Sequence, residues 1–330
     1  MHAIRQHQFG APDVLRYEQL PDPEPGPGQL RIAVLASGVH LLDTKIRAGE
    51  AGGPFPLPAL PMTPGREVAG TVDAVGPDVD RAWLGRRVVG HLGQASGGYA
   101  ELALAAADAV HPIPDGLAAP AAVAMIGTGR TTLAILEAAP PAADDVVLVP
   151  AAAGGIGNLL VQAARAAGAT VVGLAGGPEK TARVAELGAT IALDYDQDGW
   201  AARLRDALGE RRATVVYDGV GGPVGRAALE LLGPRGRLVL FGWSAGAPTR
   251  LDATDVLGRG ISVTGAIGPR VLAGPNGRGG LRAWEVAALE AAASGRLRPL
   301  VGPPFPLAAA ADAHRALVAR RTIGKTVLVP

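Results

Sequence analysis

A turn of small residues between two apolar runs is the stretch whose residue types and spacing indicate chemistry most directly. The turn, Ala151-Ala-Ala-Gly-Gly-Ile-Gly157, follows the run Val146–Val149 and opens a helical pattern that leads to a second run, Thr170–Leu174. A strand, a glycine-rich turn, a helix and a second strand within about thirty residues form the βαβ unit that binds dinucleotides. Glycines let the backbone approach a pyrophosphate, and the helix N-terminus directs free N–H groups at the phosphates. We therefore predict a phosphate cradle formed by Ala153, Gly154, Gly155, Ile156 and Gly157.

The fit to the dinucleotide pattern is imperfect at one position. Ala152 stands where the first glycine of G-x-G-x-x-G would be. A glycine-rich turn in another kind of α/β protein is therefore the alternative interpretation of this stretch.

The residues beyond the second run indicate which dinucleotide binds. An NAD site carries Asp or Glu about twenty residues past the glycines, where the carboxylate holds the ribose 2′-hydroxyl. Leu174-Ala-Gly-Gly177 offers no carboxylate, and Lys180 follows it. A compact ammonium suits a 2′-phosphate, and lysine is rare here, since Lys45, Lys180 and Lys325 are the only lysines among 31 basic residues. We predict NADPH, with an exposed cation at the start of a helix as the alternative for Lys180.

Length and composition limit the class of protein. A chain of 330 residues, with 48% hydrophobic and 18% charged residues, is too long for one ordinary core, so we expect two globular domains. A net charge of +1 gives no electrostatic reason to expect nucleic acid or an anionic membrane as a partner. The absence of Cys excludes disulfides and thiolate nucleophiles or metal ligands. Without an apolar run of membrane-spanning length or a signal-peptide pattern, we expect a cytoplasmic protein.

Hydrophobic periodicity divides the chain into two styles of structure. Residues 1 to about 120 contain short alternating or apolar segments separated by Gly and Pro, as in a β-rich domain. From Ala118 helices alternate with strands, which predicts a doubly wound parallel sheet, and the last part returns to the first style. Beyond the first βαβ unit, we expect helices at 121–126, 131–139, 179–187, 200–208, 223–232, 284–294 and 309–319, and strands at 190–193, 213–217, 237–241, 261–267 and 326–329.

Further motifs lie along nearly the whole chain. They are Gly38-Val-His-Leu-Leu-Asp-Thr-Lys-Ile-Arg-Ala-Gly49, Pro64-Gly-Arg-Glu-Val-Ala-Gly-Thr-Val72, Gly85-Arg-Arg-Val-Val89, Gly97-Gly-Tyr-Ala-Glu101, Val216-Tyr-Asp-Gly-Val-Gly221 and Phe241-Gly-Trp-Ser244. With the Ala-Ala-x-Gly-Gly-x-Gly turn and Gln162, they resemble the medium-chain dehydrogenase/reductase superfamily, and most closely its zinc-independent quinone oxidoreductases and enone reductases. The resemblance implies a GroES-like catalytic domain of residues 1–122 and 268–330, a Rossmann NADPH-binding domain of residues 123–267, and a homodimer.

The same resemblance, taken residue by residue, implies further cofactor contacts. Tyr195 would stand beside the 2′-phosphate with Lys180, and Arg320 matches a C-terminal arginine of the family. A threonine on the helix after the domain junction would face the nicotinamide; Thr131 is the best match, Thr132 is the alternative, and either could be an ordinary helix residue. The family also uses the main chain around three positions near the nicotinamide: Val220, Phe241 and Gly242.

The metal-binding positions of the related alcohol dehydrogenases carry other residues in this chain. Those enzymes hold catalytic zinc with a Cys in the Gly-Val segment and a His in the Gly-His-Glu segment, where this chain has His40 and Arg66. A permanently charged guanidinium cannot be a ligand, and a single histidine is not a site. The segment 90–98 also has no room for a four-Cys structural lobe. We predict no bound metal.

The chain also departs from the quinone reductases in the first motif. It has His40 where they normally have Asn, and Lys45 where they normally have Tyr. His40 could donate a proton to a reduced substrate, and Lys45 could polarise a carbonyl, so we name both as candidate catalytic residues with Thr131. A histidine hydrogen-bonded within the fold and a surface lysine are the alternatives. We expect an ion pair between Asp43 and Arg47; the sequence identifies no partner for His91, His111 or His314.

Three functions remain open from the sequence. The first is an NADPH-dependent reductase that transfers hydride to a quinone or an α,β-unsaturated carbonyl without zinc. The second keeps the fold but acts on a specialised metabolite such as a polyketide, with His40 and Lys45 binding that substrate. The third is an NADPH-binding protein without enzymatic activity.

Overall fold

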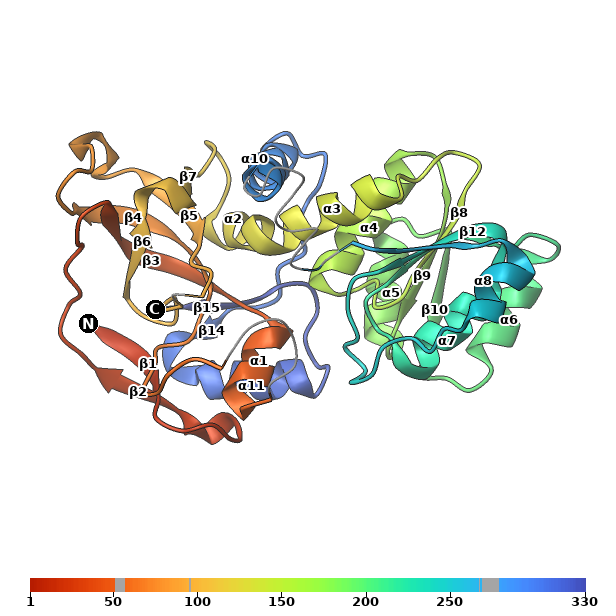
Figure 1. Cartoon of the computed structure of the whole chain (residues 1–330), viewed down its shortest axis with the longest axis horizontal. Helices are drawn as coiled ribbons and strands as arrows, with labels where there is room; N and C mark the ends of the chain where they lie inside the picture. The colour runs from red at the N-terminus through yellow and green to blue at the C-terminus, as the bar shows by residue number, and fades with distance from the viewer. Residues whose placement is uncertain (51–56, 95, 267, 269–278) are drawn as a thin grey trace. The chain divides into compact units, whose positions relative to one another are not determined.

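The computed structural model describes residues 1–50, 57–94, 96–266, 268 and 279–330. Its contacts divide the chain into two compact units, one of residues 1–128 with 285–330 (unit 1) and one of residues 129–284 (unit 2) (Figure 1). Unit 1 therefore contains both chain termini, and unit 2 is an insertion into it. The boundaries expected from the sequence, 122/123 and 267/268, remain a prediction about independently folding domains, and residue 267 lies outside the described residues.

Unit 2 is built on a parallel sheet of six strands in the order β10-β9-β8-β11-β12-β13. The chain starts in the middle with β8, adds β9 and β10 on one side, and then returns to add β11, β12 and β13 on the other. This strand order confirms the predicted doubly wound sheet. The strands are β8 (Val146–Val149), β9 (Thr170–Ala175), β10 (Ile191–Asp194), β11 (Ala213–Asp218), β12 (Leu232–Leu240) and β13 (Ser262–Gly265).

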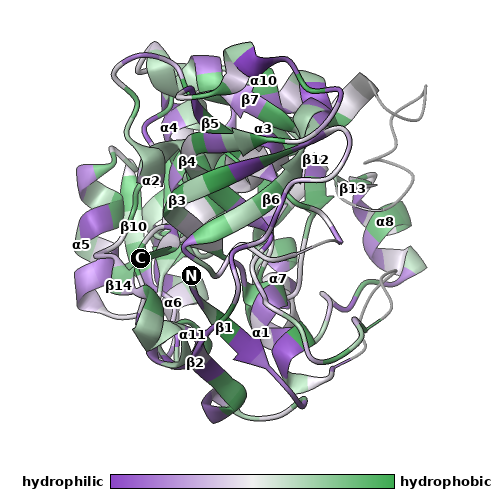
Figure 2. Ribbon diagram, turned by 90° about the vertical axis from the view of Figure 1, so that its left-hand side faces the viewer, coloured by the Kyte–Doolittle hydropathy of each residue, from purple (hydrophilic) through white to green (hydrophobic). Residues whose placement is uncertain are grey.

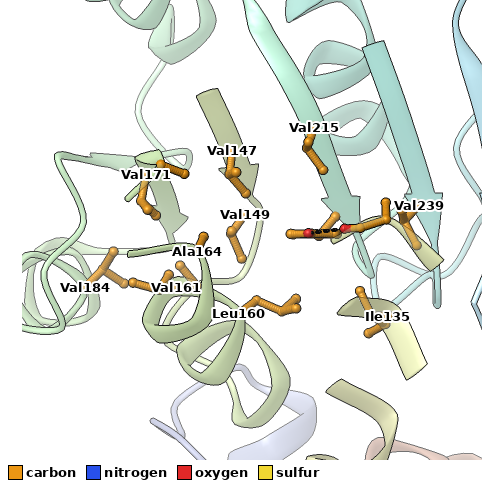
Figure 3. Close-up of a cluster of buried hydrophobic side chains, with 14 of the residues drawn as sticks. Ile135, Val147, Val149, Leu160, Val161, Ala164, Val171, Val184, Val215 and Val239 are labelled. Carbon is orange, nitrogen blue, oxygen red and sulfur yellow. Dashed lines mark hydrogen bonds between the residues drawn. The ribbon is translucent and has the colours of Figure 1, made fainter. Parts of the chain in front are cut away.

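Helices cover both faces of this sheet, and each face has its own apolar core. One core joins β8, β9, β11 and β12 to α3 (Arg130–Ala138), α4 (Gly155–Ala166) and α5 (Pro178–Glu186) (Figure 3). The other joins the opposite face to α6 (Trp200–Leu208), α7 (Gly222–Leu231) and α8 (Ala253–Arg259). Successive residues of β8 point to opposite faces: Val147 and Val149 enter the first core, and Val146 and Leu148 enter the second. A strand buried on both faces must be apolar throughout, which is why this run was recognisable in the sequence.

Unit 1 is β-rich, as predicted. A seven-stranded sheet runs β14-β15-β3-β4-β5-β7, with β6 paired to β3, and β1 pairs with β2 separately. Helix α11 (Ala310–Val318) packs beside β15 and contributes Ala310 and Ala313 to an apolar core with Val39 and Tyr99. The strands are β1 (His2–Gln6), β2 (Leu15–Gln19), β3 (Gln29–Val39), β4 (Glu67–Val75), β5 (Arg87–His91), β6 (Leu102–Ala106), β7 (Val110–Pro112), β14 (Phe305–Pro306) and β15 (Thr326–Val329).

Two helices were not expected from the sequence. Helix α1 (Leu41–Ala48) follows β3 directly, begins after His40 and ends at Gly49, which has φ 79°. Helix α8 begins after Asp252, whose side chain accepts hydrogen bonds from the backbone N–H groups of Thr254 and Asp255. In Figure 2 α8 carries both hydrophilic and hydrophobic segments, as does α5. Each of these helices has only about two turns, too few for a clear hydrophobic periodicity. Their formation therefore depends more on capping and packing than on the sequence pattern.

One expectation about membranes needs correction. Helices α2 (Ala119–Ala124) and α3 are joined by a π-helical turn into a stretch, 119–138, that by length and composition alone could cross a membrane. Within its most apolar window 67% of the residues are buried inside the protein. A buried core helix passes the same test, so this stretch is weak evidence for a span.

Candidate functional site

The predicted cofactor residues of unit 2 gather at the carboxyl ends of its parallel strands. The turn 150–154 follows β8, while Lys180 and Tyr195 follow β9 and β10. Val220 and Phe241 follow β11 and β12. The strand order reverses between β8 and β11, so the loops that follow these two strands run in opposite directions from this point. In open α/β sheets this is where ligands bind.

The glycine turn has the geometry that a phosphate cradle needs. Ala151 takes a left-handed conformation with φ 53°, and Gly154 is the residue before the first turn of α4. A Cβ added to Gly157 would lie 2.3 Å from the carbonyl oxygen of Ala151, so only glycine allows α4 to pack this closely on the turn. The turn thus brings the N-terminus of a twelve-residue helix to the sheet edge.

A buried asparagine, which the sequence analysis did not identify, fixes this turn. Asn158 is 0% exposed, and its amide donates to the carbonyl oxygens of Gly154 at 2.8 Å and Gly155 at 2.7 Å. The side chain of Gln162 in turn donates to the Asn158 carbonyl oxygens. A polar residue on the apolar face of a predicted helix was the available signal, because buried amides are retained where they have hydrogen-bond partners.

Lys180 and Tyr195 are brought to the same corner of the sheet. β9 and β10 pair in parallel with Ala175 opposite Asp194, and the Tyr195 N–H donates to the Ala175 carbonyl at 3.0 Å. Lys180 is half-buried in the first turn of α5, which starts three residues after β9 ends. The two residues are fifteen positions apart in the sequence, and the parallel register is what places both of them at this corner.

Two carboxylates lie near the same corner and were not considered from the sequence. Asp194 accepts hydrogen bonds from the backbone N–H groups of Gly177 and Asp196, and the first of these lowers the pKa of its carboxyl. It therefore acts as a brace for the loop between β9 and α5. The carboxylate of Asp196 lies beside Gly176, where an added Cβ would come within 2.5 Å of its Oδ2.

On the other side of the switch point, Asp218 organises the loops that carry Val220 and Phe241. The Asp218 carboxylate accepts from the N–H groups of Val220 at 2.8 Å and Gly221 at 3.0 Å, and also from the Thr249 hydroxyl. Val220 is 2% exposed, and its carbonyl accepts from the Ala245 N–H. Both main-chain groups of Val220 therefore already have partners within these loops, and its carbonyl oxygen can offer a ligand only its second lone pair.

Close packing of Phe241 explains two small residues in these loops. A Cβ on Gly219 would lie 2.3 Å from the Phe241 ring, and one on Gly242 would lie 3.2 Å from the Gly219 carbonyl oxygen. The segment Phe241-Gly242 thus lies directly against the loop after β11.

The remaining predicted contacts lie elsewhere. Thr131 is half-buried in α3, whereas Thr132 is 0% exposed, so a ligand can reach Thr131 more easily than its neighbour. Arg320 belongs to unit 1, follows α11, is exposed and has φ 54°. The cofactor roles of Thr131 and Arg320 stay predictions.

Unit 1 brings charged residues together in one row across four neighbouring strands. Register pairs Gly38 of β3 with Glu67 of β4, and Glu67 with His91 of β5. Thr326 of β15 pairs with Val39, which places Lys325 level with His40 just beyond the strand ends. Because side chains alternate along a strand, residues in register share one face of a sheet. Four residues far apart in the sequence therefore meet at one point.

The contacts within this row are short. Glu67 is 0% exposed; its Oε1 lies 2.7 Å from His40 Nε2, and its Oε2 lies 2.6 Å from Lys325 Nζ. Lys325 Nζ also lies 3.2 Å from His40 Nε2, and the rings of His40 and His91 meet edge to face. Burial alone would raise the pKa of Glu67, but His40 and Lys325 outweigh it and hold that pKa well below its usual range. Glu67 is thus a buried carboxylate that stays ionised.

A second buried network holds the backbone of His40. The Asp43 carboxylate accepts from the His40 N–H at 2.8 Å and from the Tyr99 hydroxyl at 3.2 Å, and that hydroxyl also contacts Nε2 of His314 at 3.2 Å. With Nε2 of His314 as donor, one directed chain of hydrogen bonds runs from His314 through Tyr99 to Asp43. Burial raises the pKa of Tyr99 well above its usual value and lowers the pKa of His314 to about 4.

This network corrects one expectation from the sequence and supplies partners that it lacked. The predicted ion pair of Asp43 with Arg47 is wrong, because the Arg47 side chain instead donates to the Gly10 carbonyl at 3.1 Å. His314 contacts Tyr99, and His111 lies 2.9 Å from Glu285. Such partners come from segments more than 170 positions away and are invisible to local spacing.

Lys45 has a different environment from His40. Its ammonium pairs with Glu50 at 2.7 Å, and 46% of its side chain is exposed. This is the geometry of the surface-lysine alternative, and a catalytic role for Lys45 stays a prediction. Arg66 is 8% exposed and donates to the Gly93 carbonyl at 3.1 Å, which fixes the loop after β5.

Comparison with known proteins identifies the class to which this fold and these loops belong. Residues 26–115 match the family model of the alcohol dehydrogenase GroES-like domain, and residues 155–276 match that of the zinc-binding dehydrogenases. The quinone oxidoreductase of Pseudomonas aeruginosa is 34% identical over 324 residues, which cover 98% of this chain and 97% of that protein. The chain therefore belongs to the medium-chain dehydrogenase/reductase family, as the sequence motifs predicted.

Further relatives within that family are also similar to this chain over nearly their whole length. The 2-haloacrylate reductase of a Burkholderia species is 32% identical over 330 residues, covering 98% of this chain and 97% of that protein. The Escherichia coli quinone oxidoreductase, solved in complex with NADPH, covers 100% of both chains with a TM-score of 0.87 and 29% identity. A mycobacterial protein complexed with NADPH covers 100% of both with a TM-score of 0.86 and 35% identity. The relatives that these comparisons name are thus oxidoreductases.

The name of the second family model implies zinc, and the charged row of unit 1 tests that implication. His40, Glu67 and His91 each offer one ligand atom, and these atoms lie within 4.8 Å of one another. The prediction that His40 stands alone is therefore wrong. However, the Lys325 ammonium already contacts both Glu67 and His40, so a cation occupies the place that a metal ion would need. The described residues do not fit a bound zinc ion.

Proposed function

We propose that this protein is an NADPH-dependent reductase that transfers hydride to a quinone or an α,β-unsaturated carbonyl without zinc. The observation that carries the proposal is the strand-end edge of unit 2, where the glycine turn, Lys180 and Tyr195 gather. The turn suits a pyrophosphate, and the ammonium of Lys180, at the start of α5, suits a 2′-phosphate. The NADPH complexes of the Escherichia coli and mycobacterial relatives support the choice of cofactor.

Each part of this edge has a distinct task toward the cofactor. The N–H groups of residues 153–157 and the dipole of α4 would hold the pyrophosphate, and Asn158 keeps that turn rigid. Lys180 and Tyr195 would hold the 2′-phosphate, and the main chain at Val220, Phe241 and Gly242 would face the nicotinamide. NADPH bound in this way supplies the hydride.

His40 is the proposed source of the proton that completes the reduction. Its Nε2 lies 2.7 Å from the ionised Glu67 carboxylate, which orients the ring and favours a proton on that nitrogen. The His40 side chain also accepts from the backbone N–H of Asp43 at the start of α1, and 26% of the side chain is exposed. Hydride addition to an unsaturated carbonyl leaves an enolate, to which a protonated His40 would give the proton. Glu67 would act only by positioning the ring.

The acceptor is a small molecule of the quinone or activated-alkene class. The quinone oxidoreductases among the relatives support the first kind, and the 2-haloacrylate reductase supports the second. A screen of NADPH oxidation against quinones, enals, enones and 2-haloacrylates tests the proposal. Tight NADPH binding without turnover of any acceptor would instead favour a binding protein. The homodimer and the cytoplasmic location stay predictions.

Substitutions at the 2′-phosphate corner test the cofactor choice. Lys180→Ala should raise KM for NADPH by about tenfold to a hundredfold and leave KM for NADH nearly unchanged, because it removes a charge-assisted contact to the phosphate. Asp196→Ala is the matched control at the same corner, and it should not weaken the binding of NADPH. An equal effect of Lys180→Ala on both cofactors contradicts the proposal.

A substitution in unit 1 tests the proton donor. His40→Ala should lower kcat by about a hundredfold, the lower range of general-acid contributions, with KM for NADPH unchanged. The exposed His7→Gln serves as control. A kcat of His40→Ala equal to that of the native protein would remove His40 from the mechanism and leave the cofactor assignment intact.

A further inference from the structure

The buried surroundings of Glu67 have room for a carboxylate and one cation. Glycines form two of their walls: a Cβ on Gly127 would lie 1.7 Å from Glu67 Oε1, and one on Gly38 would lie 2.1 Å from Oε2. The Gly38 position would also come within 2.9 Å of Lys325 Cε. No side chain larger than hydrogen fits at either position without displacing the ion pair. Glu67, at 0% exposure, and Lys325, at 4%, are therefore built into unit 1 together.

The same group of side chains presents the ligand atoms of a metal site. Two imidazoles and one carboxylate form the protein ligand set of a well-known class of zinc sites that keep a fourth position open. His40, Glu67 and His91 present such atoms within 4.8 Å of one another. His91 is oriented by the Gly93 N–H, which donates to its Nδ1 at 3.1 Å and leaves Nε2 toward other partners. A metal at Nε2 would require the proton to move to Nδ1, at the cost of that one hydrogen bond.

Lys325 is held where it meets these atoms by the backbone around it. Its N–H donates to the Leu300 carbonyl at 2.8 Å, and its carbonyl accepts from the Gly302 N–H at 3.0 Å. The pairing of Thr326 with Val39 then fixes the height of Lys325 beside β3. A lysine anchored on both sides in this way is a fixed part of the fold. Its ammonium repels any second cation placed between the same ligand atoms.

We propose that the Lys325 ammonium takes the place of a divalent metal ion among His40, Glu67 and His91, so that the native chain carries a closed metal site. The lysine supplies the positive charge that a buried carboxylate requires, and its contact with an imidazole is made at Nε2 of His40. His40, 26% exposed, is thereby not bound to a metal and stays available to a substrate, and in this one consequence the inference rests on the proposed function. The closed site itself makes no assumption about the reaction.

Removal of the ammonium should open the site. In untagged Lys325→Met, Co²⁺ should bind with one equivalent per chain and give the visible d–d bands of a low-coordinate site, with an affinity about a hundredfold above that of the native chain. Zn²⁺ should displace the Co²⁺ and raise the thermal unfolding temperature of the variant by linkage. The native chain, dialysed against the same Zn²⁺ solution, should retain no stoichiometric metal.

Control variants identify the ligands. Lys45→Met removes an exposed lysine from the same unit and should leave metal binding at the native level. Adding His91→Ala or His40→Ala to Lys325→Met should weaken Co²⁺ binding by about tenfold or more. Binding by Lys325→Met that both additions leave unchanged would overturn the assignment of the ligands.

Two further outcomes would overturn the proposal. One equivalent of Zn²⁺ bound tightly by the native chain and lost in His40→Ala would mean that the site is open. If Lys325→Met does not fold alone, it can be refolded in the presence of Co²⁺, with the double variant Lys325→Met/Glu67→Gln, which has no unpaired carboxylate, as the comparison. Recovery of folded Lys325→Met with Co²⁺ supports the proposal. If the double variant folds but Co²⁺ does not restore the folding of Lys325→Met, the proposal is refuted. These measurements involve no turnover of substrate. The closed-site proposal can therefore fail while the NADPH reductase proposal holds, and the reductase proposal can fail while the closed site is confirmed.

Discussion

The proposed cofactor site at the carboxyl ends of the unit 2 strands (the cofactor edge) and the charged row of unit 1 (His40, Glu67, His91 and Lys325) are built in opposite ways. At the cofactor edge, main-chain groups and glycines at successive strand ends form most of the proposed site. The carboxylates of Asp194 and Asp218 hold the loops in place by accepting backbone hydrogen bonds. In the charged row, side chains from four neighbouring segments of the sheet meet, and His40 and Lys325 hold the Glu67 carboxylate in its ionised form. A site made of backbone tolerates changes of side chain as long as the turns remain. A site made of buried charges depends on every member, because each one left without its partner carries the full cost of desolvation.

The largest expected effect comes from breaking the charged row. Glu67→Gln should lower the free energy of unfolding by about 3–5 kcal/mol, because it leaves the Lys325 ammonium buried without its carboxylate. Glu67→Gln combined with Lys325→Met should recover a large part of that loss, since no unpaired charge then remains. Urea unfolding of the four proteins in this double-mutant cycle measures the coupling. Two additive single effects would show that the ion pair does not hold unit 1 together.

Acid should loosen unit 1 through His314, whose side chain faces Tyr99, Asp43 and Arg47. Burial lowers the pKa of His314 from 6.5 to about 4, so between these values the unfolded chain binds a proton that the folded chain does not. Stability should therefore fall as the pH drops from about 6.5 to 4, by up to about 3 kcal/mol from this group. His314→Gln should flatten this part of the stability profile, and the exposed His7→Gln should not. An unchanged acid slope in His314→Gln would contradict the buried neutral imidazole.

A smaller effect is expected at the cofactor edge, from a single methyl group. Gly157→Ala places a Cβ against the Ala151 carbonyl and should cost about 1–3 kcal/mol while raising KM for NADPH. Gly258→Ala in helix α8 is the matched control: its Cβ meets open space, so it should be neutral or stabilise by up to about 1 kcal/mol. Thermal unfolding and NADPH titration measure both variants. A harmless Gly157→Ala would show that close helix packing is not what this glycine provides.

The parts of the fold that could be predicted are those in which a contiguous sequence pattern determines the local structure. The apolar run at β8, the glycine turn and α4 form one contiguous signal, and α6 (Trp200–Leu208) and β15 (Thr326–Val329) were predicted to the residue. Lys180 stood out because lysine is rare in this chain. Helix α1 was missed because its eight residues lie within a segment dominated by strand patterns, and its first residues are fixed by Asp43.

The charged row could not be predicted, for a different reason. His40, Glu67, His91 and Lys325 lie up to 285 positions apart, and no spacing rule connects them. Their meeting depends on which strands are neighbours and on the register of each pair, and a shift by one residue would turn Glu67 to the other face of the sheet. The interpretation of His40 as an isolated histidine was therefore reasonable from spacing and wrong in three dimensions.

The sequence alone determined the fold class, the glycine turn and the family, because each is carried by a contiguous pattern of small or apolar residues. Only the tertiary structure decided what surrounds His40. Strand register brings Glu67 and Lys325 to its ring, and the contacts of His40 and Lys325 with that carboxylate keep it ionised despite its burial. A dinucleotide turn is a property of neighbours along the chain, whereas a buried ion cluster is a property of neighbours across the sheet.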